Sequence, residues 1–287
     1  MDAQPSKTTY IVNSAIDVAA AAAGTHKPGP RIYLVVSRKG GVGKSTFVAQ
    51  LSAVVADTLG PDPVTGEPVV AAISADPQGS LKWWMQNIEN GNPDGAPFFY
   101  IQLTEDGDLE DLSRLRELPF RHIFVDTPGW QDIKEDTKLL GDSREAKIMR
   151  ILLAQADGVI VPVEVEPMSW EPTTSTIEHV IKPSGVPYVC VVNNWEPRDG
   201  GVEKNPDRDN CIDFIDGMGW NRAHNTVRHY RVHAQAPLNG LVCTQYRQNR
   251  MELNAGLDFY RLAVELGLGK AQPRVEMITS RLEGAEQ

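Results

Sequence analysis

The fold is decided by residues 31–46, which read RIYLVVSRKGGVGKST. The first part of this stretch, Ile32 to Val36, is apolar and rich in β-branched residues, as is typical of a strand buried in a parallel sheet. A glycine-rich turn follows, and a helical pattern begins near Ser45. This order predicts that the turn lies at the carboxyl edge of a sheet and leads directly into the N-terminus of a helix.

The turn resembles a phosphate-binding loop. It departs from the general pattern G-x-x-x-x-G-K-[ST] at the first position, which is Arg38, and matches the deviant form K-G-G-x-G-K-[ST]. Glycines allow backbone N–H groups to surround phosphate oxygens, and the helix N-terminus adds partial positive charge. The strand and the amphipathic helix on either side disfavour the alternative, a surface turn without a ligand. We predict nucleotide binding by Lys39, Gly40, Gly41, Val42, Gly43, Lys44, Ser45 and Thr46.

This deviant loop is similar to that of the family that contains ParA-like partition ATPases, the division-site ATPase MinD and the nitrogenase iron protein. The resemblance implies that Lys44 contacts the β- and γ-phosphates of ATP and that the Ser45 hydroxyl holds Mg²⁺. It also implies that Lys39 reaches the nucleotide of a second subunit. We therefore expect a homodimer that forms with ATP.

A second anchor is the segment HIFVDTPG at residues 122–129. Apolar residues that end in an aspartate at the carboxyl edge of a strand resemble a Walker-B element, which implies that Asp126 holds Mg²⁺ through water. The Thr-Pro-Gly turn after it resembles the segment that responds to the γ-phosphate in related switch ATPases.

A predicted strand at residues 69–73 ends in SADPQGSL, residues 74–81. Members of the resembled family commonly have D-x-D-P-Q-G here, and Ser74 replaces the first aspartate. The resemblance implies that Asp76 is catalytic, orienting or deprotonating the attacking water together with the phosphate-binding Lys39 and Lys44. The alternative is that Asp76 caps the following helix. Trp83 and Trp84 follow, and we interpret them as core or subunit-interface residues.

Strand-like segments alternate with helical ones along the chain. This alternation, with phosphate chemistry at strand ends, predicts an α/β fold with a single doubly wound, mostly parallel sheet, a P-loop NTPase of the deviant Walker A type. We expect a flexible arm at residues 1–30, an ATPase domain at 31–270 and a C-terminal tail at 271–287. The resemblance is to the small type of ParA-like protein, without an N-terminal helix-turn-helix. The strands are predicted at 98–103, 122–126, 158–163 and 186–192, and the helices at 47–59, 143–155, 169–181 and 252–268.

The predicted strand at 186–192 is followed by Asn193 and Asn194. At the corresponding place, members of the resembled family use an asparagine to bind the edge of adenine, because an amide can both donate and accept hydrogen bonds. We favour Asn193 for this role, with a simple strand-ending turn as an equal alternative.

The segment from Asn221 to Arg250 contains no acidic residue, although the chain as a whole has a net charge of −10. Such a local concentration of positive charge is typical of a surface that contacts phosphates, and we interpret it as a site for sequence-independent DNA binding. The alternative is that some of these arginines pair with acidic residues or build the dimer contact. The candidate DNA-binding residues are Arg222, Arg228, Arg231, Arg247 and Arg250.

The composition disfavours several other classes of protein. Three scattered cysteines are too few for a disulfide framework or a cysteine metal site, and they do not follow the switch strands as an iron–sulfur reductase would require. The acidic run at 104–111 is better explained as the solvated start of a helix than as a metal site. We see neither a membrane-spanning run nor the basic amphipathic end of MinD-type relatives, so we expect a cytoplasmic protein without a stable membrane anchor.

Together these features predict an ATPase that hydrolyses ATP with Mg²⁺, dimerises with ATP, and segregates or positions DNA by nucleotide-controlled binding, in association with the nucleoid. The resemblance implies a ParB-like or other small activating partner. The alternatives are an ATP-gated scaffold that positions a protein cargo or a conjugation complex, and a MinD-like ATPase that cycles on and off a membrane.

Overall fold

The structure is a computed structural model that describes residues 28–76, 79–103, 109–129, 133–134, 139–199, 201, 203–246 and 249–284. Residues 1–27 of the expected arm, the acidic residues 104–108 and the candidate DNA contact Arg247 lie outside these ranges. The described strands are β1 (Arg31–Val35), β2 (Val70–Ser74), β3 (Phe99–Gln102), β4 (His122–Asp126), β5 (Ile133–Lys134), β6 (Leu139–Leu140), β7 (Gly158–Glu164), β8 (Tyr188–Trp195) and β9 (Val227–Arg228).

The helices follow the strands in the alternation that the sequence predicted. They are α2 (Lys44–Leu59), α3 (Ser80–Gly91), α4 (Leu109–Ser113), α5 (Arg144–Gln155), α6 (Trp170–Thr176), α7 (Lys182–Ser184), α8 (Pro206–Gly217), α9 (Arg231–Asn239), α10 (Arg250–Glu265) and α11 (Gln272–Gly284). Four short helical turns complete the set: η1 (Leu115–Glu117), η2 (Pro167–Ser169), the π-helical η3 (Ile177–Ile181) and η4 (Cys243–Gln245).

Local sequence sets several of these helix ends. The Ser143 hydroxyl accepts a hydrogen bond from the backbone N–H of Ala146 and caps α5, and Asn249 caps α10 in the same way. Asn205 caps α8, where Pro206 occupies the first helical position. These side chains satisfy N–H groups that a helix leaves without an intrahelical partner.

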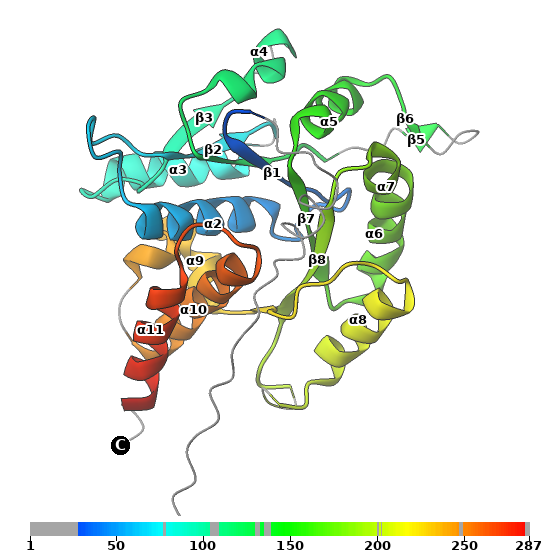
Figure 1. Cartoon of the computed structure of the whole chain (residues 1–287). Helices are drawn as coiled ribbons and strands as arrows, with labels where there is room; N and C mark the ends of the chain where they lie inside the picture. The colour runs from blue at the N-terminus through cyan, green and yellow to red at the C-terminus, as the bar shows by residue number, and fades with distance from the viewer. Residues whose placement is uncertain are drawn as a thin grey trace, which may run out of the picture.

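Seven strands of the described chain form one sheet in the order β3-β2-β4-β1-β7-β8-β9, and every pairing in it is parallel. The chain moves from β1 towards one edge and then crosses from β4 to β7 on the other side of β1. Ligands of such sheets bind at the carboxyl ends of the strands beside this change of direction, which here means β1, β4 and β7. The predicted doubly wound sheet is confirmed (Figure 1).

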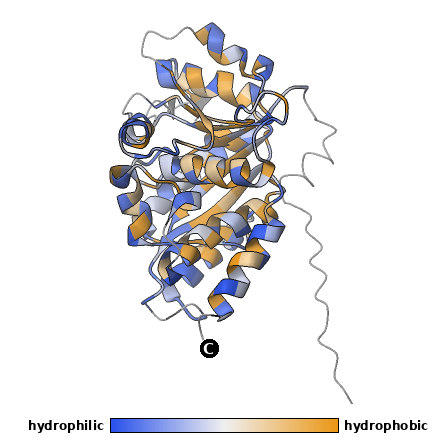
Figure 2. Cartoon of the chain, turned by 90° about the vertical axis from the view of Figure 1, so that its left-hand side faces the viewer, coloured by the Kyte–Doolittle hydropathy of each residue, from blue (hydrophilic) through white to orange (hydrophobic). Residues whose placement is uncertain are grey.

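Two hydrophobic cores lie on the two faces of the sheet because successive strand side chains point in opposite directions. Tyr33 and Val35 of β1 join the core beneath α2, α3, α9, α10 and α11. Ile32 and Leu34 join the other core, beneath α4, α5, η3 and α8. Figure 2 shows the apolar residues concentrated on the strands and on the helix sides that face them.

Helix α2 is buried almost all round, which its predicted apolar stripe did not indicate. Besides the sheet it packs against α10 and η4. The fully buried Gln50 on its outer side donates to the Tyr246 hydroxyl at 2.7 Å and accepts from the Cys243 N–H at 2.6 Å. The C-terminal third of the chain therefore covers the helix that carries the phosphate-binding loop.

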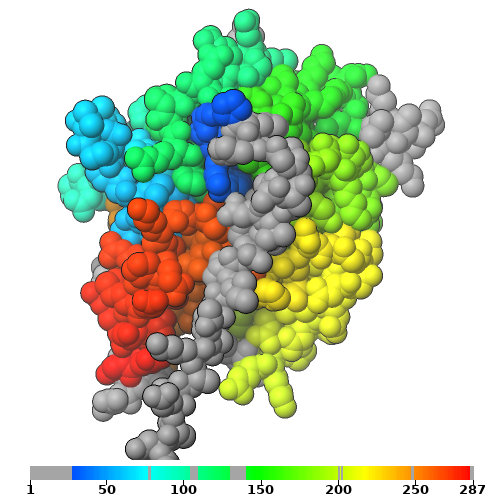
Figure 3. All heavy atoms as spheres, in the orientation of Figure 1, coloured from blue at the N-terminus to red at the C-terminus, as the bar shows by residue number. Residues whose placement is uncertain are grey.

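Residues 272–284, which the sequence analysis placed in the tail, form α11. Ile278 is buried against α10, and Val275 and Leu282 pack beside it. Arg274 pairs with Asp57 of α2 at 2.8 Å. Figure 3 shows the orange and red residues of α10 and α11 on the same side of the molecule as the cyan residues before and within α3. None of the helices in the described ranges combines the length and apolar character needed to cross a bilayer.

Candidate nucleotide-binding site

The predicted phosphate-binding loop connects β1 to α2 at the carboxyl edge of the sheet. Gly43 is the residue before α2 and has φ 90°, a left-handed conformation that residues with a Cβ adopt at a cost. A Cβ at Gly43 would also lie 3.0 Å from Nδ2 of Asn193. The sequence needs glycine here for both backbone conformation and space.

Ser45 and Asp126 meet in front of this loop. Oγ of Ser45 donates to Oδ2 of Asp126 at 2.6 Å, and Lys44 is close enough to favour the charged form of the same carboxylate. The parallel register of β1 and β4 places Asp126 beside Val35, just before the loop. The structure thus brings together the two residues that the sequence predicted as Mg²⁺ ligands.

The environment of Asp126 suits a carboxylate that binds a cation. It is fully buried, and its Oδ1 has no hydrogen-bond partner. Burial raises the pKa of Asp126 to about 6, and nearby Asp76 also raises it, while Ser45 and Lys44 lower it. A hydroxyl, a carboxylate and phosphate oxygens with water are ligands that Mg²⁺ prefers. The residues present therefore fit Mg²⁺ bound together with a nucleotide.

Asp76 is nearly buried, two residues after the end of β2 and close to Asp126. The next helix, α3, begins after Gly79, which has no side chain to cap it, and capping by Asp76 stays an alternative prediction. Ser74, which stands where the resembled family has an aspartate, donates its hydroxyl to the Asp76 carbonyl at 3.4 Å. It supports the backbone of Asp76 but adds no second carboxylate.

A pocket of about 200 Å³ opens beside the loop, lined by Gly41, Gly43, Glu164 and Asn193 together with Asn194, His229 and Tyr230. Asn193 is nearly buried and donates Nδ2 to the Val42 carbonyl at 3.0 Å. Asn194 has φ 64° and its Oδ1 lies 2.6 Å from Nδ1 of His229. The strand does not end at the asparagines, because β8 continues to Trp195 through an irregularity against β9. The adenine contact of Asn193 and the turn alternative both stay predictions.

Lys39 does not point into solvent. Its Nζ lies 2.9 Å from Oε2 of Glu164, at the end of β7, and 3.7 Å from Oε2 of Glu166. The sequence analysis did not identify either carboxylate, although both stand in the short segment VEVEP that follows an apolar strand. Both residues could have been predicted as site residues, because they are acidic and stand at the carboxyl end of a predicted parallel strand.

The comparisons with known proteins agree with this geometry. No family model matches the chain. The carboxysome distribution protein A ("Maintenance of carboxysome distribution protein A") of Gloeobacter kilaueensis is 26% identical over 239 residues, which cover 83% of this chain and 94% of that protein. The chain is therefore similar to this distribution protein over most of its length.

Solved structures show that the chain shares the fold of McdA and MinD. The ATP complex of a Cyanothece McdA variant superposes with a TM-score of 0.56 at 14% identity, covering 84% of this chain and 98% of that one. MinD of Pyrococcus horikoshii with Mg-ADP gives 0.57 at 15% identity, with 81% and 96% covered. Those structures hold ATP and Mg-ADP, and the ligands that the sequence predicted for this chain are ATP and Mg²⁺.

The arginines of the predicted DNA surface are not all available to phosphates. Arg228 is paired with Asp258 of α10 at 2.5 Å, and both side chains are buried. Arg222 donates to both carboxylate oxygens of Asp216, at 2.9 and 3.2 Å. The sequence analysis named pairing with acidic residues as the alternative to DNA binding, and these two arginines show such pairing. We do not retain them as DNA contacts. Arg231 and Arg250 are exposed at the first positions of α9 and α10.

Other side chains of the chain are structural. Trp84 is buried and donates Nε1 to the Leu241 carbonyl at 3.0 Å, whereas half of Trp83 is exposed. Cys190, Cys211 and Cys243 are buried thiols in three different elements, and burial raises their pKa values. None of the three lines the pocket at the loop.

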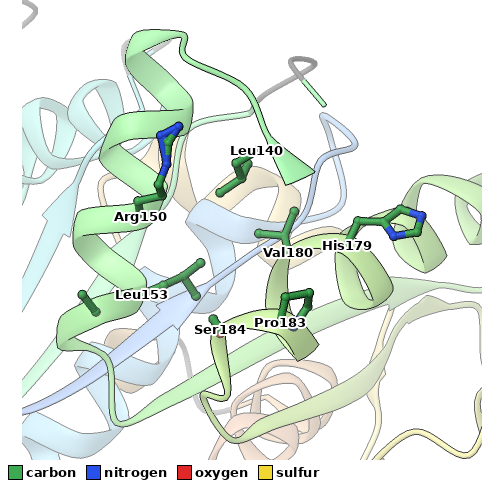
Figure 4. A pocket seen from close by; sticks show the side chains of 8 residues that line it. Leu140, Arg150, Leu153, His179, Val180, Pro183 and Ser184 are labelled. Atoms are coloured by element: carbon green, nitrogen blue, oxygen red, sulfur yellow. The ribbon is translucent and has the colours of Figure 1, made fainter. Parts of the chain in front are cut away.

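A second pocket, of about 380 Å³, lies away from the loop and shares no lining residue with the first. Leu153 and Arg150 of α5 form one side, Val180 and Pro183 of η3 and α7 form the other, and Leu140 of β6 lies at one end (Figure 4). This larger pocket has no glycine-rich loop and no buried carboxylate among its lining residues. The pocket at residues 41–46 therefore remains the candidate nucleotide site.

Proposed function

We propose that the chain is a Mg²⁺-dependent ATPase whose ATP-bound homodimer positions a large cellular cargo. The observation that carries this proposal is the meeting of Ser45, Asp126 and the glycine-rich loop at the carboxyl edge of the sheet, with one buried carboxylate oxygen of Asp126 left without a partner. An ATP phosphate chain in the loop, with Mg²⁺ beside it, would satisfy that oxygen.

The chain's own residues support hydrolysis as follows. Lys44 is nearly buried at the start of α2, where its ammonium group stabilises negative charge on the terminal phosphates. In this proposal Asp76 orients a water molecule and accepts its proton. Mg²⁺, when bound, neutralises charge that develops on the phosphates. Burial of these groups excludes competing water and strengthens their electrostatic effect.

The class of cargo is inferred from the relatives. The name of the Gloeobacter protein states a role in carboxysome distribution, which is the positioning of a protein assembly. A protein cargo was one of the alternatives that the sequence analysis left open, and we propose it as the first candidate here. A small activating partner that promotes hydrolysis, as the family resemblance implies, would then recycle the dimer.

Segregation of DNA remains a second candidate. It is supported by exposed Arg231 and Arg250 at the starts of α9 and α10. One such surface per subunit gives weak attachment, and pairing two of them raises the effective affinity, so ATP-dependent dimerisation can control DNA binding. In this version DNA serves as the matrix over which the cargo is moved or as the cargo itself. A membrane-cycling role is less supported, because the apolar side of α11 is already packed against α10.

Phosphate release and mass photometry with the purified full chain test this proposal. We expect ATP hydrolysis that requires Mg²⁺, and a doubling of mass with ATP but not with ADP. Lys39→Ala should abolish the ATP-dependent dimer, and an unchanged doubling of its mass would contradict the role of Lys39. A wild-type chain that neither binds nor hydrolyses ATP with Mg²⁺ would refute the proposed function. Pull-downs with ATP and with ADP would then separate protein cargo from DNA.

A further inference from the structure

Lys39 is held inside its own subunit by a defined ion pair. Its ammonium group donates to Oε2 of Glu164 at 2.9 Å. Side-chain exposure is 29% for Lys39 and 10% for Glu164, so the contact is largely shielded from water. Glu166 lies further away at 3.7 Å, and 74% of its side chain is exposed. Glu164 is therefore the main partner of Lys39.

The position of Glu164 is fixed independently of Lys39. The backbone carbonyl of Glu164 accepts hydrogen bonds from the Ser169 hydroxyl and from Nε1 of Trp170, each at 3.1 Å. Trp170 in turn stacks on Phe214 of α8 at a ring distance of 4.4 Å. These contacts hold the backbone of Glu164 in place at the end of β7, and the Lys39 side chain extends to the carboxylate.

The loop is also held close to this strand end. The backbone N–H of Arg38 donates to the Thr176 hydroxyl at 3.3 Å, and its guanidinium donates to the Ser175 hydroxyl at 3.4 Å. Both hydroxyls belong to α6, which follows β7. Gly129 of the Thr-Pro-Gly turn lies next to Arg38, since a Cβ there would be 3.8 Å from the Arg38 carbonyl. The turn expected to respond to the γ-phosphate is therefore in contact with the residue before Lys39.

The negative charge of Glu164 would repel a triphosphate bound in the loop. It lines the same pocket as Gly41 and Gly43, and the register of β7 and β8 pairs it with Asn193. Lys39 now neutralises its charge. If Lys39 left, a buried carboxylate would face the phosphates without a cation, which is unfavourable.

We propose that Glu164 is a positioning residue that holds Lys39 in its own subunit, so that this ion pair must open before Lys39 can enter the nucleotide site of a second copy. The inference rests on the proposed ATP-dependent dimer and names a regulator of it. The pair stabilises the monomer and so raises the ATP concentration that dimerisation requires. This keeps the resting protein monomeric until the loop is filled.

Glu164→Gln tests the inference because it removes the charge and keeps the shape. Mass photometry over a range of ATP concentrations with Mg²⁺ should show half-maximal dimerisation at an ATP concentration lower than that of the wild type by roughly threefold or more. The matched control Glu166→Gln, on the exposed carboxylate, should shift the midpoint by less than about twofold. A midpoint that Glu164→Gln leaves unchanged or raises would overturn the role of Glu164.

A second measurement needs no nucleotide. Urea unfolding of the nucleotide-free chain should show that Lys39→Ala destabilises it, because Glu164 then lies buried without its cation. Adding Glu164→Gln to Lys39→Ala should restore part of that stability. If the two substitutions are simply additive, the pair does not couple and the inference fails. A wild type that never dimerises with ATP would instead refute the proposed function, and this unfolding cycle would still decide whether the ion pair exists.

Discussion

Ser45 Oγ donates to Asp126 Oδ2 at 2.6 Å, although 81 residues separate them in the sequence. The pairing of Val35 with Asp126 in the β1 and β4 register brings them together. Burying the Asp126 carboxylate has a cost in stability, which the first prediction measures.

Asp126→Asn should stabilise the nucleotide-free chain at neutral pH. The pKa of Asp126 is raised from 3.8 to about 6, so between these pH values the folded chain binds a proton that the unfolded chain releases. Stability contributed by the protonated carboxyl is therefore lost as pH rises through about 6. At pH 8 the variant should gain roughly 1–3 kcal/mol in free energy of unfolding, and the gain should shrink towards pH 5.

Chemical denaturation at pH 5 and pH 8 without Mg²⁺ measures this difference. Glu67→Gln, on an exposed loop, is the control and should show no such pH dependence. An equal or larger gain at pH 5 would contradict the assignment of the raised pKa to Asp126.

The same Asp126→Asn variant should lose Mg²⁺-dependent hydrolysis. An amide oxygen is a weaker ligand for a hard cation than a carboxylate, so the rate of phosphate release should fall by about 10²-fold or more. A rate above a tenth of the wild-type value at saturating Mg²⁺ would contradict the role of Asp126. A variant that is more stable but no longer hydrolyses ATP would show that Asp126 serves ligand binding and not the stability of the fold.

The sequence predicted features that depend on contiguous residues, and it could not predict contacts between residues far apart in the chain. The loop at 39–46 and the strand ending at Asp126 are contiguous patterns, so both the fold and the phosphate site followed from them. The pair Arg228 and Asp258 was missed because 30 residues and a helix separate its members, and from sequence Arg228 looks like any basic surface residue. The role of Glu164 was missed for the same reason, since it lies 125 residues after Lys39. Burial, which decides whether an arginine faces DNA or a carboxylate, depends on the packing of α10.

Gly43→Ala should damage the loop more than Gly40→Ala. At Gly43, φ is 90° and an added Cβ would press on Asn193, whereas at Gly40 nothing lies within 4 Å. We expect Gly43→Ala to cost about 1–2 kcal/mol of stability and to weaken ATP binding at least about tenfold, since the loop must shift. Gly40→Ala should stay within about 0.5 kcal/mol of the wild type. Calorimetric titration with ATP and thermal unfolding give the two quantities, and equal effects of the two variants would contradict this geometry.

Asp258→Ala should destabilise the fold without acting on the phosphates. The substitution leaves the Arg228 guanidinium buried without its partner, which typically costs about 3–5 kcal/mol. The paired change Arg228→Met with Asp258→Leu should recover much of the loss, because apolar residues of similar size avoid the unpaired charge. Thermal unfolding distinguishes the two variants. A small loss for Asp258→Ala would show that the ion pair is open in solution and that Arg228 is available after all.

If DNA is bound, the contacts should come from Arg231 and Arg250. Replacing both with alanine should weaken retention of DNA and lower the slope of log affinity against log salt by about 2, because each lost phosphate contact removes about 1. Arg222→Ala is the matched control: its guanidinium is held by Asp216, so the slope should not change. Gel shifts with ATP over a range of salt concentrations provide the measurement. A slope that falls for Arg222→Ala but not for the double variant would place the DNA surface on the segment between α8 and β9 instead. An unchanged slope in both would favour a cargo recognised without DNA.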